Sequence, residues 1–109
     1  MHAHVDLAAF AASAPDDGIL SRTVHADDDV KVVWFGFGPE QELSEHTASM
    51  PAMMHVLAGE GSLTRGDQTI EAHAGTWVHM PAGLRHAVRA RGPMIMLLTL
   101  LKGARAPGT

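Results

Sequence analysis

The chain has 109 residues, 46% of them apolar and 18% charged, which is the size of one domain with a single core. Its 8 basic and 12 acidic side chains give a formal charge of −4 with neutral histidines, whereas nucleic-acid-binding domains usually carry a basic excess. The absence of cysteine excludes disulfides, a thiolate nucleophile and iron–sulfur clusters, and the absence of tyrosine excludes a catalytic phenol. Chemistry must therefore use the 8 histidines, the carboxylates and hydroxyls, or a group that the histidines bind.

The N-terminal stretch is apolar but does not have the pattern of a secretory signal. No Lys or Arg precedes it and Asp6 stands at its start, which favours a short helix over about Val5–Ser13. The longest apolar run elsewhere, Met94–Leu101, has eight residues, whereas a membrane-spanning helix needs about 20. We therefore expect a cytoplasmic protein that binds neither membranes nor nucleic acid.

From residue 19 onward, short apolar runs alternate with Gly, Pro and Asp turn signals, which is typical of an all-β sandwich or barrel. The predicted strands are Ile19–His25, Val30–Phe37, Gln41–Ala48, Ala52–Ala58, Gly61–Arg65, Thr69–His73, Thr76–Met80, Arg85–Arg91 and Met94–Leu101. We expect an N-terminal segment at 1–18, one barrel domain at 19–102 and a flexible C-terminal tail at 103–109.

The run Arg85–Arg91 shows the clearest alternation of apolar and charged residues. His86, Val88 and Ala90 share one face of the predicted strand, and the arginines share the other. If the apolar face looks into the core, a histidine lies inside the barrel.

Two predicted strands, Val30–Phe37 and Met94–Leu101, are apolar on both faces. A strand in a barrel wall needs only one apolar face, so something must cover the other. A second copy of the chain is the economical cover, because two-fold homodimers are the commonest assemblies. We predict a homodimer that forms through a sheet face.

The segment Gly38–Ala90 resembles the cupin superfamily. The second motif of that family has a Gly, a Pro, a Gly and a His at fixed spacing, and this chain keeps all four, as Gly75, Pro81, Gly83 and His86. The stretch that matches the first motif runs from His46 to Gly59. The resemblance implies a jelly-roll β-barrel, or double-stranded β-helix, of the small single-domain, RmlC-like type with one conserved type-2 barrel.

The resemblance also indicates where a metal would bind. A typical metal-binding cupin uses two His and a Glu of the first motif and the His of the second. At these positions the chain has His46, Ala48, Ala52 and His86, so two of the four ligands are missing.

Two interpretations of the site remain open. If His79 faces inward, then His46, His79 and His86 form a three-histidine site for one divalent transition metal such as Zn, Fe, Ni, Mn or Cu. Otherwise the inward histidines hydrogen-bond to backbone or water in a metal-free pocket. Strand parity turns His55 outward when Ala52 is taken as inward.

The predicted pocket is mainly apolar. Its expected lining consists of Met54, Val56 and Val88, with Trp34 and Trp77 as further wall residues. Such a pocket suits a small aromatic or carbonyl-bearing molecule. The chain is then either a metal-dependent enzyme, an oxygenase or isomerase acting on a small organic substrate, or a metal-free small-molecule-binding or sensor protein without catalytic activity. A barrel without any ligand is a third alternative.

Overall fold

The computed structural model describes residues 4–7, 14–47 and 49–103, and of Glu45 and His46 it describes the backbone. Its strands are β1 (Ile19–Ala26), β2 (Val30–Phe37), β3 (Glu42–His46), β4 (Ala52–Ala58), β5 (Glu60–Arg65), β6 (Gln68–His73), β7 (Trp77–Met80), β8 (His86–Ala90) and β9 (Met94–Leu101). All nine predicted strands are present, and where their ends differ from the prediction they differ by one or two residues.

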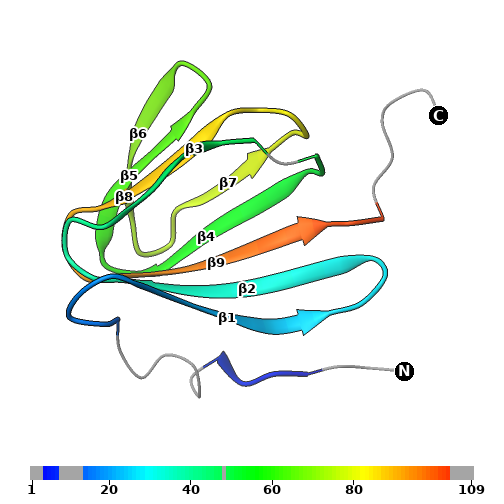
Figure 1. Cartoon of the computed structure of the whole chain (residues 1–109), viewed down its shortest axis with the longest axis horizontal. Helices are drawn as coiled ribbons and strands as arrows, with labels where there is room; N and C mark the ends of the chain where they lie inside the picture. Colours follow the sequence, from blue (N-terminus) through cyan, green and yellow to red (C-terminus); the bar gives the residue numbers. More distant parts are fainter. Residues whose placement is uncertain (1–3, 8–13, 48, 104–109) are drawn as a thin grey trace.

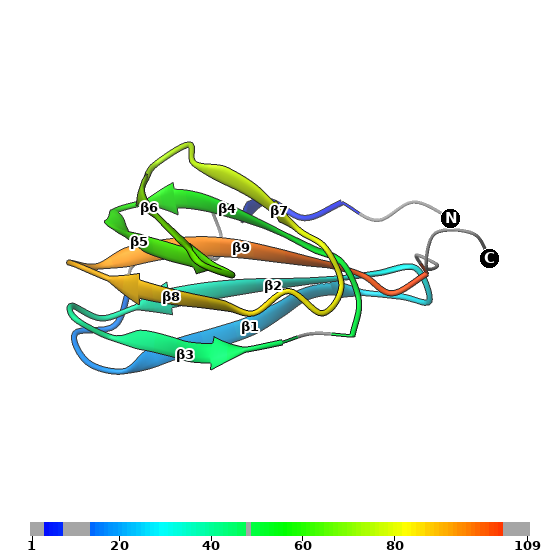
Figure 2. The same cartoon turned by 90° about the horizontal axis from the view of Figure 1, so that it is seen from above.

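The strands form two antiparallel sheets that pack face to face (Figures 1 and 2). One sheet has the order β1-β2-β9-β4-β7, and the other has the order β3-β8-β5-β6. The all-β, jelly-roll prediction is thus confirmed. The expected helix Val5–Ser13 falls mostly on residues 8–13, outside the described residues. Within the described part of the chain, no helix is long and apolar enough to cross a membrane.

The core lies between the two sheets and follows the two-residue period of the strands. On β4, Ala52, Met54 and Val56 are at most 2% exposed, while His55 between them is exposed. Full burial of a Met or Val side chain contributes roughly 1.5–3 kcal/mol. The core cluster also takes residues from other strands: Phe37, Leu63, Ala72, Val78, Met80, Val88, Ala90, Met94 and Met96.

The outer face of the five-stranded sheet is also partly apolar, as the two-faced pattern of β2 and β9 predicts. Trp34 lies on this face, in register with Leu97, and is 1% exposed. A Cβ atom at Gly36 would lie 2.6 Å from Cη2 of Trp34, so the glycine leaves room for the indole ring. Pro15 lies against the same position.

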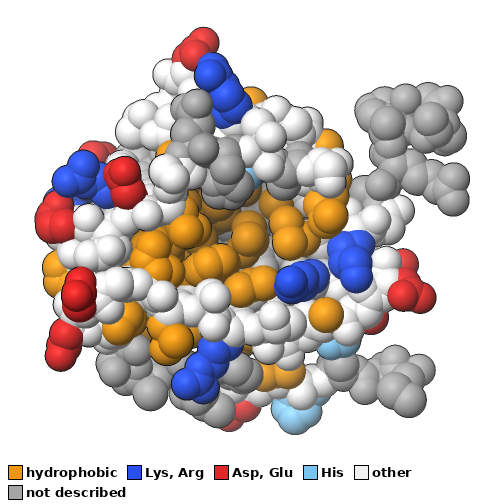
Figure 3. All heavy atoms as spheres, viewed as in Figure 1, with side chains coloured by type: hydrophobic (Ala, Val, Ile, Leu, Met, Phe, Trp, Pro, Cys, Tyr) orange, Lys and Arg blue, Asp and Glu red, His pale blue; other side chains and the backbone are white. Residues whose placement is uncertain are grey.

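The sandwich is open along one side. β1 ends one sheet and β3 ends the other, and the two strands do not pair with each other. Figure 3 looks onto this side and shows apolar side chains gathered across its centre, between the two sheets. Ile19 on β1, Phe35 on β2 and Leu43 on β3 are half-buried residues that pack against the core. The apolar interior therefore reaches the surface beside β1 and β3.

Candidate functional site

His86 lies inside the sandwich, as predicted from the strand face that it shares with Val88 and Ala90. It is 4% exposed, whereas Arg85 and Arg89 on the opposite face are exposed. Its Nδ1 atom lies 3.1 Å from the carbonyl oxygen of Leu84. Because a carbonyl oxygen only accepts, Nδ1 is the donor, and in the neutral ring the lone pair is then on Nε2. In this tautomer Nε2 is an atom that can accept a hydrogen bond or bind a metal ion.

His46 and His86 are backbone partners across β3 and β8. The register shifts between Leu43, which pairs with Val88, and His46, which pairs with His86. The bulge thus adds one residue to β3 and brings the first histidine of the predicted site opposite the second.

Arg65 extends this row of the sheet on the other side of His86. The two residues are backbone partners on β5 and β8. The Nη1 atom of Arg65 lies 3.5 Å from the carbonyl oxygen of His79 on β7, the edge strand of the other sheet, so the side chain reaches from one sheet to the exposed edge of the other. Its Nε atom is buried and has no hydrogen-bond partner among the described residues.

Sequence reasoning missed Arg65, although a signal was present. Arg65 has the same parity as Leu63, which is 1% exposed, and alternation along Gly61–Arg65 would have turned it inward. A charged residue at the end of a strand usually faces solvent, which makes this signal easy to overlook.

A second cation, Lys31 on β2, faces the same interior. It is half-buried and shares the inner face of β2 with Val33, Phe35 and Phe37. It pairs with Leu100, which pairs in turn with Ala52.

Lys31 and Arg65 lie at the same end of the sandwich. The backbone partner of Ala52 on β7 is Met80, so Met80 lies at the same level of the sheet as Lys31. Met80 follows His79 in the chain, and Arg65 contacts the carbonyl oxygen of His79. Among the described side chains, no carboxylate lies on the inner rows at this end. Lys31 and Arg65 therefore place two positive charges at this end of the interior.

His79 does not join His86 in the interior. The inner face of β7 has Val78 and Met80, at 5% and 2% exposure, so His79 and Trp77 are on the outer face. The condition for a three-histidine site with His79 is not met. His55 is exposed and pairs with Trp77, in agreement with its predicted outward direction.

The expected wall residues divide into two groups. Met54, Val56 and Val88 are buried between the sheets, in agreement with their predicted inward direction. Trp34 and Trp77 lie on the outer face of the five-stranded sheet, which corrects their expected position in the pocket wall. The reason is the same for both: their strands are apolar on both faces, so alternation alone did not decide which face is inner.

The described side chains do not form a complete metal site. No group of three or more His, Asp or Glu residues among them is arranged to hold an ion. Ala52, at the position where metal-binding cupins have a Glu, is a buried methyl group without a donor atom. Ala48 lies outside the described residues. The described groups of this row, His86 and the guanidinium group of Arg65, do not by themselves fit a divalent cation.

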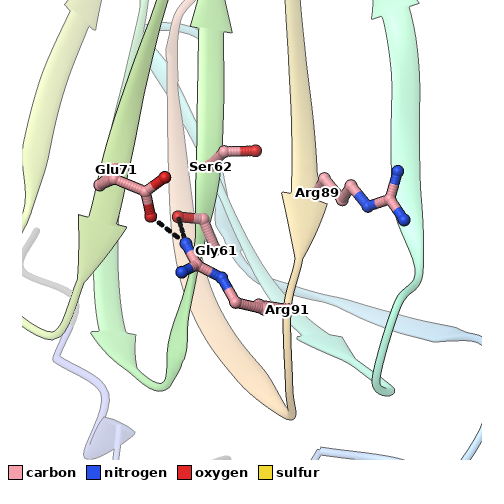
Figure 4. A pocket seen from close by; sticks show the side chains of 5 residues that line it. All are labelled: Gly61, Ser62, Glu71, Arg89 and Arg91. Atoms are coloured by element: carbon pink, nitrogen blue, oxygen red, sulfur yellow. Dashed lines mark hydrogen bonds and ion pairs between the residues drawn. The ribbon is translucent and has the colours of Figure 1, made fainter.

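A shallow depression of about 190 Å³ lies on the outer face of the four-stranded sheet, lined by Gly61, Ser62, Glu71, Arg89 and Arg91 (Figure 4). Arg91 pairs with Glu71, and Nη2 of Arg89 lies 3.1 Å from Oε2 of Glu40. Figure 4 shows Glu71 and Arg91 pointing toward each other and Arg89 pointing away. The arginine charges of this surface are therefore matched by carboxylates.

Two antiparallel sheets around an apolar core, with a histidine buried between them, define a β-barrel of the jelly-roll class. The model of the cupin domain family matches residues 33–100, which is more than half of the chain. The chain belongs to the cupin family.

Solved structures agree with this assignment. A conserved protein of unknown function from Streptococcus pyogenes is 30% identical with a TM-score of 0.82, over 96% of this chain and 92% of that one. An RmlC-like cupin from Desulfovibrio desulfuricans is 30% identical with a TM-score of 0.77, over 94% and 97%. A cupin superfamily protein from Desulfitobacterium hafniense is 27% identical with a TM-score of 0.79, over 85% of each chain. None of the curated proteins matches this chain significantly.

Proposed function

We propose that this chain is a binding protein that holds a small, largely apolar organic molecule between its two sheets without a catalytic metal. The observation that carries this proposal is the apolar interior that opens between β1 and β3 (Figure 3). Small-molecule sites in proteins are concave and mainly apolar, with a few polar groups that fix orientation. Here His86 is such a group, because its Nδ1 hydrogen bond to the Leu84 carbonyl holds the ring in place.

The alternative is a metal-dependent enzyme of the oxygenase or isomerase type. The backbone pairing of His46 with His86 favours it, because histidine is a common ligand of transition metals. A tightly held catalytic ion normally needs a third protein ligand, and the described inner positions offer alanines and Arg65 instead. The binding function therefore has more support.

The proposal is tested with a neutral apolar fluorophore, phenylnaphthylamine. Its emission should rise saturably on binding, with one site per chain. Replacing Leu43 with Trp should abolish the binding, because Leu43 lies at the open side and packs against the core. Leu20→Trp is the matched control, because Leu20 is 40% exposed and pairs with Gly36 on the outer face. Non-saturable binding, or equal loss in both variants, would refute an interior site.

We also propose a homodimer that forms through the outer face of the five-stranded sheet. A row of outward residues crosses three strands there, with Leu97 on β9, His55 on β4 and Trp77 on β7 in register. Trp77 is 56% exposed, and Met53 and Leu57 on the same face are half-buried. Exposed Trp beside partly buried apolar side chains is typical of protein–protein contacts.

A further inference from the structure

We propose that the molecule bound between the sheets has an acidic group, a carboxylate or sulfonate on an apolar body, that Arg65 binds this group, and that the charge of Lys31 adds to the attraction. The inference rests on the proposed binding function and names the chemical class of its ligand. For this inference to hold, a negatively charged group must be stable at the end of the interior where His86 lies.

The first support is the unsatisfied hydrogen-bonding capacity of Arg65. Its Nε atom is buried without a partner among the described residues, and its Nη1 atom has only a 3.5 Å contact with the His79 carbonyl. A buried N–H group without an acceptor is costly, and proteins rarely leave one unpaired. A guanidinium group presents its N–H donors in a fork that matches the two oxygens of a carboxylate. An acidic ligand would satisfy these donors.

The second support is the charge at this end of the sandwich. Lys31 faces the same interior from the opposite sheet, and no hydrogen bond or ion pair involves its side chain among the described residues. No described carboxylate lies on the inner rows beside Arg65 to neutralise it. Two cations in a partly desolvated interior raise the potential there, which favours an anion and disfavours a metal cation.

The third support comes from a contrast with the surface arginines. Arg89 and Arg91 each have a carboxylate partner, Glu40 and Glu71. Arg65 is more buried than either and lacks such a partner. The apolar surroundings limit the ligand to a single acidic group, because a polyanion would lose too much hydration against the Phe35 and Leu98 side chains.

The experiment compares two probes with nearly the same ring system. Anilinonaphthalene sulfonate has one negative charge, and phenylnaphthylamine has none. We expect the anionic probe to bind at least about tenfold more tightly, in line with one charge-assisted hydrogen-bonded pair. In Arg65→Gln most of the preference for the anionic probe should be lost, because the guanidinium group is lost. Lys31→Gln should lower the ratio by a smaller factor, because an ammonium group is a point charge without the paired donors of a guanidinium group.

Arg89→Gln is the matched control and should leave the ratio unchanged, since Arg89 lies on the outer face and pairs with Glu40. If Arg65→Gln does not fold, as judged by its circular dichroism, the Lys31→Gln ratio decides. Failure of the neutral probe to bind the wild-type protein would overturn the proposed function. Saturable binding of the neutral probe without a preference for the anionic one would overturn only this inference. A preference for the anionic probe that survives both Arg65→Gln and Lys31→Gln would also overturn this inference.

Discussion

His46 on β3 and His86 on β8 are direct backbone partners, although 40 positions separate them in the sequence (86 − 46). The bulge between Leu43 and His46 creates this pairing, because without the shift a different residue would lie opposite His86. The pairing unites one residue of each sequence motif at one level of the sheet. It brings two histidines together, while the neighbouring position on β5 is occupied by Arg65.

The metal content of the protein is the first prediction. After incubation with Zn, Fe, Ni, Mn or Cu ions and desalting, the wild-type protein should hold clearly less than one equivalent of any of them. The reason is that Ala48 and Ala52 stand at two of the four ligand positions of metal-binding cupins, and the guanidinium group of Arg65 adds positive charge. Elemental analysis of the wild-type protein, His46→Ala and His86→Ala measures this directly. His73→Ala is the control, because His73 is exposed.

The opposite outcome would be equally clear. Near-stoichiometric metal that disappears in His46→Ala and His86→Ala but remains in His73→Ala would show a complete ligand set. The metal-dependent enzyme would then replace the binding protein as the working hypothesis.

Two glycines with positive φ should differ sharply in their tolerance of a methyl group. At Gly59, φ is 86° and a Cβ atom would lie 2.1 Å from the carbonyl oxygen of Pro93. At Gly75, φ is 95° and no atom lies within 4 Å of the added Cβ. We expect Gly75→Ala to cost about 1–2 kcal/mol of unfolding free energy from backbone strain alone. Gly59→Ala should cost about 1–3 kcal/mol more, because the backbone must also shift.

Urea denaturation followed by circular dichroism gives both unfolding free energies. Equal destabilisation of the two variants would mean that the tight approach of Gly59 to Pro93 relaxes without cost.

The sequence predicted the strands well because their turns are marked by Gly, Pro and Asp and their faces by a two-residue period. The clearest example is β8, where a charged residue on one face alternates with Val88 and Ala90 on the other. The inward direction of His86 followed from that pattern without any knowledge of the neighbouring strands.

The same rule could not decide strands without a polar face. In β7, the four residues Trp77, Val78, His79 and Met80 give no contrast between the two faces. The direction is set by pairing with β4, whose inner residues Met54 and Ala52 oppose Val78 and Met80. Such pairing joins segments far apart in the chain, so His79 and Trp77 could not be placed from local sequence.

The proposed dimer makes a third prediction. Trp77→Asp should convert the dimer into a monomer of 11.6 kDa in sedimentation at micromolar concentration. The change adds charge to an exposed position, so the fold itself should tolerate it. Loss of a buried Trp at an interface typically costs at least about 2 kcal/mol of binding free energy. Gln68→Asp on β6 of the other sheet is the control and should remain dimeric.

A monomeric wild-type protein would contradict the dimer outright. A dimer that survives both Trp77→Asp and Leu97→Asp would mean that another surface forms the contact.

The turn between β1 and β2 should make stability depend on pH in the acid range. Oδ1 of Asp27 accepts the backbone N–H groups of Asp29 and Val30, at 2.8 and 2.9 Å, and Oδ2 lies 2.7 Å from Nε2 of His25. These contacts lower the pKa of Asp27 from 3.8 to about 2. The hydrogen bond from the N–H of Val30 has the largest effect, followed by those from His25 and from the N–H of Asp29. Because the folded state lowers this pKa, the ionised carboxylate stabilises the turn.

The sign of the effect follows directly. The contribution of Asp27 is fully present above the unfolded pKa of 3.8 and is lost as the pH falls through the folded value of about 2. Asp27→Ala should therefore be less stable than the wild-type protein at neutral pH, and the difference should shrink as the pH falls through this window. Asp28→Ala is the control, because no hydrogen bond of its side chain is found among the described residues. Thermal melts of the three proteins across this range measure the effect, and a difference between wild type and Asp27→Ala that does not change with pH would contradict it.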